Sequence, residues 1–291
     1  MTTAAPARPL TALQLARDKS RYDLDAKPER WTPGPPFDSL DVRPGRVILL
    51  GAPPGAGKTT LALQLMGDLI ARHALRAVVA NVETAPPVLL DKLLARLAGV
   101  DFTALINREL TADERRRIDA ALEQHADTLD RLAFHGGRFN VPALFETMRT
   151  FNARLAVVDY VQRFSASEAE DRMKLDRIMS QVRILADAGA AVLVISSVAR
   201  QKDKSGSSTY AGLSMAAFRG SAELEFGADS AFLLNLDKRS GVAVLQCVKQ
   251  RFGPEIDIPL RFCGPLQRFD PGDPLDGFDA APGPQQKKGK P

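Results

Sequence analysis

A glycine-rich segment carries the residue types that surround the phosphates of a nucleotide. Gly55 and Gly57 allow backbone N–H groups to turn toward phosphate oxygens, and a helix beginning here adds its positive end. Lys58 is placed to contact the β- and γ-phosphates, and the Thr59 hydroxyl suits Mg²⁺. An apolar run precedes the segment and a helical pattern follows it, which is the context that a phosphate loop requires. The expected nucleotide-binding residues here are Ala52, Pro53, Pro54, Gly55, Ala56, Gly57, Lys58, Thr59 and Thr60.

Acidic and hydroxyl residues follow three further apolar runs. Asp159 ends the run that begins at Leu155, where a carboxylate can hold Mg²⁺ through water. Glu83 follows the run after the phosphate-loop helix, so we expect it to face the γ-phosphate and orient the attacking water. Ser196 and Ser197 follow a later run, and either hydroxyl could sense the γ-phosphate; Ser197 is included in the expected site. The carboxyl ends of parallel strands meet at one sheet edge, which brings these groups together. A strand-capping aspartate, an exposed loop glutamate and small loop serines are the alternatives without function.

The pattern of apolar segments predicts an α/β fold. Apolar runs alternate with amphipathic helices, which indicates a mostly parallel sheet flanked by helices. The last runs alternate in polarity, as antiparallel edge strands do. We expect strands at 47–50, 77–82, 132–135, 155–158, 191–195, 231–236, 242–249 and 256–262, and helices at 59–74, 86–98, 142–152 and 173–188 together with a capped helix from Thr111.

Composition sets limits on the kind of protein. The 291 residues are 45% hydrophobic, so a core needs no disulfide staples, and two cysteines favour a reducing, cytoplasmic compartment. No apolar run is long enough for a membrane span, and the net charge of +4 permits an anionic partner without requiring one. We expect a flexible segment at 1–37 with a short helix near 11–19 and a proline-rich linker at 27–36. An ATPase domain at 38–269 and a disordered tail at 270–291 follow.

Several motifs together resemble a known family. The phosphate loop with Glu83 and Asp159 looks like the RecA-type core, and the match sharpens to the replicative DnaB-type helicases and their plasmid RepA-like relatives. The segments that carry the resemblance are GAPPGAGKTTLALQL at 51–65, NVET at 81–84, VVDYVQRF at 157–164, ISSVAR at 195–200, FRGSAELEFGADSAFLL at 218–234 and VKQRFGP at 248–254. They occur in the family's order, between about Asp38 and Phe269.

The resemblance implies roles that the residues alone do not establish. It implies a RecA-like P-loop NTPase that uses ATP and Mg²⁺, forms hexameric rings and hydrolyses ATP between subunits. Lys249 and Arg251 match the pair that reaches the neighbouring subunit's γ-phosphate, with Arg251 as the trans finger. Single-stranded DNA, and a loader or other replication or recombination proteins, are the implied partners. The residues implied to contact DNA are Arg200, Lys202, Lys204, Arg219 and Ser221.

Departures from the family keep other functions open. Ser197 replaces the family's sensing glutamine, Arg219-Gly220-Ser221-Ala222 replaces its Arg-Glu-Ser-Gly, and Phe252 replaces a polar residue beside the finger. The family's N-terminal primase-binding domain is not expected in the segment before the core. The first alternative is therefore a RecA-type ATPase without autonomous unwinding, serving recombination, loading or a mobile element. A nucleotide kinase would need an arginine-rich lid that we do not find, and a scaffold would not need the complete catalytic set.

Overall fold

The computed structural model describes residues 10–165, 171–198, 201–202, 208–209, 215–218 and 221–273, and the chain divides into two compact units at residues 30 and 31. In the first unit, α1 (Ala12–Arg17) begins with a capping box, in which the Thr11 hydroxyl accepts from the Gln14 N–H and the Gln14 side chain accepts from the Thr11 N–H. None of its residues is buried. The short helix expected near 11–19 is thus present.

The second unit is built on a sheet that contains nine strands in the described part of the chain. Its order is β11-β10-β9-β8-β1-β5-β4-β2-β3. In this order, the six neighbouring strands β8, β1, β5, β4, β2 and β3 run parallel to one another. The β8–β9, β9–β10 and β10–β11 pairs are antiparallel. The predicted mostly parallel sheet with antiparallel edge strands is therefore confirmed. The strands are β1 (Val47–Ala52), β2 (Ala77–Asn81), β3 (Leu132–Phe134), β4 (Leu155–Asp159), β5 (Ala191–Ser197), β8 (Ser230–Leu236), β9 (Val242–Gln250), β10 (Ile258–Cys263) and β11 (Arg268–Pro271).

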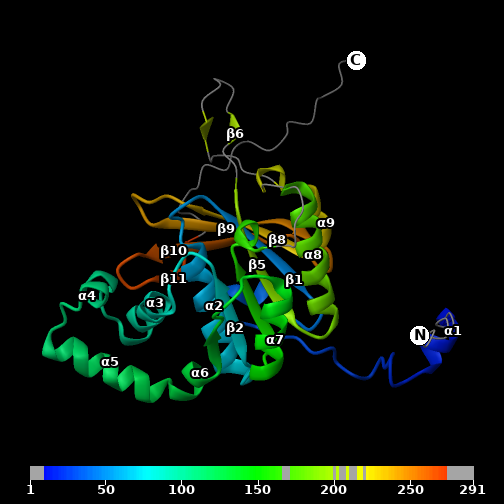
Figure 1. Cartoon of the computed structure of the whole chain (residues 1–291), viewed down its shortest axis with the longest axis horizontal. Coiled ribbons are helices and arrows are strands. Elements are labelled where there is room, and N and C mark those ends of the chain that lie inside the picture. Colours follow the sequence, from blue (N-terminus) through cyan, green and yellow to red (C-terminus); the bar gives the residue numbers. More distant parts are fainter. Residues whose placement is uncertain are drawn as a thin grey trace. The chain divides into compact units, whose positions relative to one another are not determined.

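Helices cover both faces of this sheet. In Figure 1, α2 and α3 lie on one side of it, and α7, α8 and α9 lie on the other. No helix in the described ranges is both long and apolar enough to cross a membrane. The helices are α2 (Lys58–His73), α3 (Pro86–Ala98), α4 (Phe102–Asn107), α5 (Ala112–Gln124), α6 (Ala126–Asp130), α7 (Val141–Phe151), α8 (Asp171–Asp187) and α9 (Ser221–Gly227), with 3-10 turns at Phe37–Ser39, Val161–Arg163 and Met215–Ala217 and a small ladder of β6 (Gln201–Lys202) with β7 (Ser208–Thr209).

The core consists of two layers, one on each face of the sheet. Successive side chains of β1 alternate between them, so that Ile48 and Leu50 pack with α2, whereas Val47 and Leu49 pack with α7 and α8. A smaller apolar cluster joins α3, α4 and α5. Each side chain fully removed from water contributes on the order of 1.5–3 kcal/mol. The two layers fix β1, and therefore the loop that follows it.

The proline-rich segment before β1 belongs to the folded unit. Trp31 is 3% exposed and forms a bridge with Val42, and Phe37 is 1% exposed. Both side chains join the apolar layer that contains α2. The compact unit therefore begins at Trp31 rather than at Asp38, because buried aromatic residues anchor a stretch whose prolines we interpreted as a linker. At the other end, β11 extends to Pro271, and residues 274–291 lie outside the described part of the chain.

The segment that follows β5 leaves and rejoins the core at one place. Val198 pairs with Phe218 in an isolated bridge, and both side chains are buried. A Cβ on Gly51 would come within 2.4 Å of Phe218 Cε1 and 2.8 Å of Val198 Cγ1, so glycine is needed there. Both ends of the segment between Val198 and Phe218 are thus packed against the end of β1.

Candidate functional site

The phosphate loop lies between β1 and α2, as the sequence predicts. Gly55 and Gly57 have φ of +73° and +86°, a left-handed conformation that glycine adopts without a steric penalty. Gly57 also caps α2, and a Cβ on it would come within 2.9 Å of Phe269 Cζ. Backbone N–H groups at the start of α2 therefore point toward the space above the loop, where an anion can bind them.

Asp159 lies at the centre of the site. Its Oδ2 accepts hydrogen bonds from the Thr59 hydroxyl at 2.6 Å and from the Asn81 side-chain amide at 2.5 Å. It ends β4, directly beside Asn81 at the end of β2. The side chain of Asn81 also accepts from the backbone N–H groups of Glu83 and Thr84, at 2.9 and 2.6 Å. One buried asparagine thus joins the central carboxylate to the turn that carries Glu83.

The electrostatic environment of Asp159 combines opposing effects. Burial raises its pKa above the usual value, and the charge of Glu83 acts in the same direction, whereas the hydrogen bond from Thr59 and the charge of Lys58 lower it. Because burial dominates, the ionised carboxylate is held at a cost. A divalent cation beside it would reduce that cost.

Most of the expected nucleotide-binding residues line one open cavity of about 450 Å³. Glu83 lies at its wall, so the general base expected from the sequence is beside the phosphate loop. Ala52 and Ala56 are instead buried beneath the loop, and Pro53 does not line the cavity. The lining residues are Pro54, Gly55, Gly57, Lys58, Thr59, Thr60, Glu83, Thr84, Lys92, Asp159, Tyr160, Ser197, Phe262 and Gln267.

Ser197 lines the cavity and belongs to a small polar cluster at the end of β5. The Ser197 backbone N–H donates to Gln162 Oε1 at 3.2 Å, and the Gln162 amide donates to the Ser196 hydroxyl at 2.7 Å. Gln162 comes from the 3-10 turn after β4. The end of β5 is thereby coupled to the segment that follows Asp159.

The sequence analysis missed Gln267 and Lys92, which line the cavity, and Lys238, which contacts the phosphate loop from outside the cavity lining. Gln267 accepts from the Thr60 hydroxyl at 2.8 Å and from Lys92 Nζ at 2.6 Å. Lys238, in the turn between β8 and β9, donates to the carbonyl of Pro54 at 3.2 Å. These contacts join residues more than a hundred positions apart, so no local pattern indicates them. For Asn81 a signal did exist, since an asparagine just after a strand often caps the next turn.

Lys249 and Arg251 lie at the opposite edge of the sheet. β9 runs antiparallel to β8, so its last residue pairs with Ser230, near the start of β1. The six residues of β1 separate this edge from the phosphate loop by about 17 Å, at ~3.3 Å per residue. The structure thus does not bring the expected finger to the site of its own chain.

Arg251 is held beside a buried carboxylate. Asp229 is 3% exposed and pairs with Arg251 at 3.4 Å and with Arg183 at 2.8 Å, and it also accepts from the Val47 N–H at 2.9 Å. Lys249 donates to the carbonyl of Ala228 at 2.7 Å. Burial and the charge of Arg251 lower the pKa of Lys249. The Arg251 side chain remains half exposed, which leaves it able to contact a second molecule.

The residues expected to contact DNA fall mainly outside the described part of the chain. Arg200, Lys204 and Arg219 lie in undescribed stretches. Lys202 belongs to β6, and Ser221 begins α9. The structure does describe the base of this segment, where Val198 pairs with Phe218. This bridge lies at the carboxyl edge of the sheet near the phosphate loop.

The residues at the centre of the site fit Mg²⁺. Thr59 and Asp159 supply oxygen ligands 2.6 Å apart at the foot of the cavity. Among the described residues, no group of three or more His, Cys, Asp or Glu side chains could hold a metal ion. Mg²⁺ binds through few protein ligands and takes the rest from water and phosphates, so this sparse donor set is sufficient.

The fold and the phosphate loop define an α/β domain of the RecA-like P-loop class. Residues 39–271 match the family model described as the DnaB-like helicase C terminal domain, and the chain belongs to this family. It is 26% identical over 235 residues to a replicative DNA helicase DnaB of Treponema pallidum, covering 77% of this chain and 51% of the relative. It is also 20% identical over 234 residues to a probable plasmid replicative DNA helicase of Chlamydia trachomatis, covering 77% and 50%. The chain thus spans about half the length of these relatives.

Two solved structures share the fold. The first is an ATPase domain that superposes with a TM-score of 0.70 at 16% identity, covering 79% of this chain and 86% of that one. The second, a DnaB-like replicative helicase described with its interactions with primase, gives the same TM-score and identity over 78% and 57%. The expected RecA-like core is confirmed by this likeness.

Proposed function

We propose that this protein is an ATP-hydrolysing ring motor that moves along single-stranded DNA as a DnaB-like helicase. The observation that carries the proposal is the arrangement of Lys58, Thr59, Asp159 and Glu83 around one cavity at the carboxyl edge of the sheet. Family membership supports it independently. ATP and Mg²⁺ are the proposed ligands.

At this site, the chain's own residues would position the phosphates and the attacking water. The N–H groups of the loop and Lys58 bind the phosphates, and Thr59 and Asp159 hold Mg²⁺, which when bound neutralises charge on the phosphate oxygens. Glu83 orients a water and accepts its proton as the water oxygen attacks the γ-phosphorus. The bond from that phosphorus to the bridging oxygen then breaks, and ADP and phosphate leave.

A second subunit would complete the site. Arg251 lies at the edge opposite its own phosphate loop, and it is half exposed. A head-to-tail contact between copies would bring this edge to the neighbour's cavity, and repetition of that contact closes a ring. Arg251 would then stabilise charge on the transferring phosphoryl group, with Lys249 beside it. We propose a hexamer as the assembly.

The segment between Val198 and Phe218 is the proposed DNA-binding element. It holds Arg200, Lys202 and Lys204 together with hydroxyl residues, which suit contacts with a phosphate backbone. Arg219 and Ser221 follow it. The bridge at its base packs on Gly51, immediately before the phosphate loop, so nucleotide state and DNA contact have a short route of coupling. A loader, or replication or recombination proteins, are the other proposed partners.

A strand-displacement assay with the purified chain tests this function. We expect ATP hydrolysis that single-stranded DNA stimulates, together with displacement of a labelled strand that requires ATP and Mg²⁺. Lys58→Ala should abolish both, because it removes the cation that contacts the β- and γ-phosphates. The matched control is Lys174→Ala on α8, a partly exposed lysine outside the cavity.

The outcomes separate the alternatives. DNA-stimulated hydrolysis without strand displacement would favour the RecA-type ATPase that lacks autonomous unwinding, which the substitutions at Ser197 and Arg219–Ala222 make the second candidate. Full hydrolysis by Lys58→Ala would instead remove the assignment of the phosphate loop. The molecular mass in solution, measured with and without nucleotide, would show whether the chain forms the oligomer that a ring requires.

A further inference from the structure

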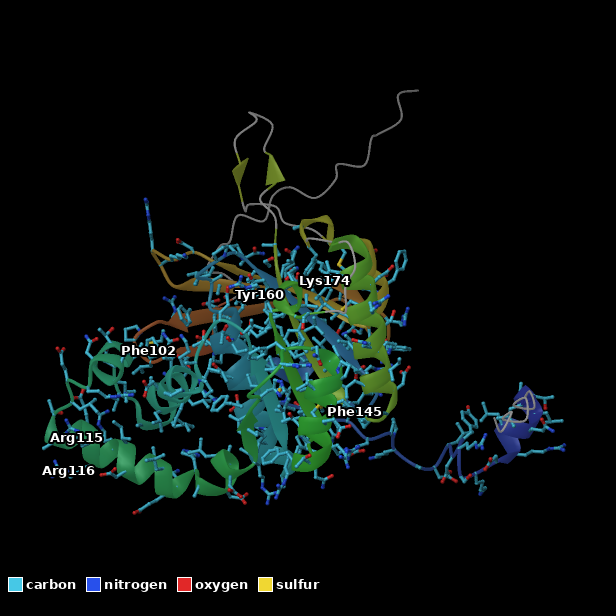
Figure 2. The ribbon with its side chains drawn as sticks, viewed as in Figure 1. Phe102, Arg115, Arg116, Phe145, Tyr160 and Lys174 are labelled. Carbon is cyan, nitrogen blue, oxygen red and sulfur yellow. The ribbon has the colours of Figure 1, made fainter. Side chains whose placement is uncertain are left out.

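Lys92 is a second lysine at the nucleotide cavity, and α3 rather than the phosphate loop carries it. Its ammonium donates to Gln267 Oε1 at 2.6 Å and lies 4.4 Å from the centre of the Phe102 ring. Figure 2 shows Phe102 at the side of the domain where α3 and α4 lie. The Phe102 N–H donates to the carbonyl of Pro265 at 2.8 Å, so this helical region is fastened to the turn that carries Gln267.

Within the described part of the chain, the charge of Lys92 is met by dipoles and not by an anion. Its ammonium contacts two neutral groups, an amide oxygen and an aromatic ring. Burial lowers the pKa of this ammonium. Holding a partly buried cation without a counter-charge costs free energy, and an anion in the adjoining cavity would offset it.

The position of Gln267 indicates which phosphate group of the nucleotide this anion would be. Its Oε1 accepts from both Lys92 and the Thr60 hydroxyl, so the ammonium lies one shared acceptor away from Thr60. Lys58 serves the β- and γ-phosphates and Thr59 the metal that bridges them. The backbone N–H groups of the loop surround the α- and β-phosphates. Because Lys58 serves the β- and γ-phosphates, the α-phosphate is the group left for a cation on the Thr60 side of the cavity.

We propose that Lys92 binds the α-phosphate of the nucleotide, with Gln267 as the residue that positions its ammonium. This proposal rests on nucleotide binding at the phosphate loop and adds a contact from a different element. It also gives α3, which follows Glu83 in the chain, a direct link to the nucleotide. Movement of α3 would then change the hold on both the α-phosphate and the general base.

Calorimetric titration of the full chain with ATP and with ADP, both with Mg²⁺, tests this contact. Lys92→Met keeps the length of the stem over Phe102 and removes the charge. We expect it to weaken ATP and ADP by the same factor, roughly 10- to 100-fold, because both carry the α-phosphate. Lys92→Arg should recover most of the affinity. The matched control, Lys174→Met, lies on α8 on the other side of the sheet and should change nothing (Figure 2).

Two results would overturn the proposal. Wild-type affinity in Lys92→Met would show that the ammonium makes no contact with the nucleotide. Loss of affinity for ATP alone would place it at the γ-phosphate instead. Should methionine lower the unfolding temperature, Lys92→Gln takes its place with the same expectations. Full ATP hydrolysis by Lys58→Ala would contradict the proposed function itself, whatever Lys92 does.

Discussion

Asn81 connects Asp159, the proposed metal-binding carboxylate, to Glu83, the proposed general base. Its amide donates to Asp159 Oδ2 at 2.5 Å, and its carbonyl oxygen accepts from the N–H groups of Glu83 and Thr84. A side chain with both a donor and an acceptor is required for this double role, and asparagine is short enough to fill it. Asn81 therefore acts through Asp159 and Glu83 rather than on the phosphates.

Replacement of Asn81 by alanine should raise the Mg²⁺ concentration needed for hydrolysis. The change removes a hydrogen bond that orients Asp159 and leaves two backbone donors without their acceptor. Loss of such a supporting contact commonly costs about 10- to 100-fold in metal affinity or activity. ATP hydrolysis measured across a Mg²⁺ titration checks this, with Asn235→Ala on β8 as the control. An unchanged Mg²⁺ dependence would mean that Asp159 is oriented by other contacts.

Among the elements, the segment from Trp31 to Val42 acts as a strap across the layer that contains α2. Trp31 pairs with Val42, and the guanidinium of Arg154 lies 4.8 Å from the centre of its ring. Phe37 is buried in the same layer. The strap thus joins the domain's start to β4 and to the helix that follows the phosphate loop.

Truncating the tryptophan to alanine should destabilise the second unit by about 3–5 kcal/mol, since it removes a large buried side chain and leaves a cavity. Urea unfolding followed by far-ultraviolet circular dichroism measures this. Trp31→Phe should lose less, and Leu24→Ala, at an exposed position of the first unit, should lose nothing measurable. Equal stability of the alanine variant and the wild type would show that the folded domain begins after Trp31.

How far the sequence predicts this molecule depends on the range of the interactions involved. The strand–loop–helix around Lys58 is local, because its glycines and flanking apolar periodicity lie in one short stretch. The contact of Lys92 with Gln267 joins residues 175 positions apart and depends on how the β10–β11 hairpin lies over α2. The segment around Trp31 was predicted to be a linker because of its prolines. Prolines argue against regular structure but not against burial, and Trp31 is buried.

At the scale of the whole molecule, the phosphate loop and Arg251 occupy opposite edges of one sheet. A rigid sheet separates them, so no movement of side chains within one chain can unite them. Asp229 ties Arg251 to the start of β1 and to Arg183 on α8. The proposed finger is therefore held in a fixed position, which suits a contact with a neighbouring copy.

Mixing two inactive variants should restore hydrolysis if Arg251 works in trans. Arg251→Ala keeps its phosphate loop and should bind nucleotide normally, whereas Lys58→Ala keeps its finger. In co-assembled equal mixtures, about a quarter of the interfaces combine an intact loop with an intact finger, so about a quarter of the wild-type rate should return. Rates of each variant alone provide the baseline, and mass measurement confirms co-assembly. No recovery in confirmed mixed assemblies, or full activity of Arg251→Ala alone, would contradict this arrangement.

In the proposed ring, the separation of loop and finger would also link the geometry of the assembly to its catalytic output. In a closed head-to-tail ring every copy both receives a finger and supplies one, so sites and subunits are equal in number. Opening the ring at one interface leaves one loop without a finger and one finger without a loop. An opened ring would therefore lack one complete site at the gap, so the rate of hydrolysis would report whether the proposed ring has closed around a DNA strand.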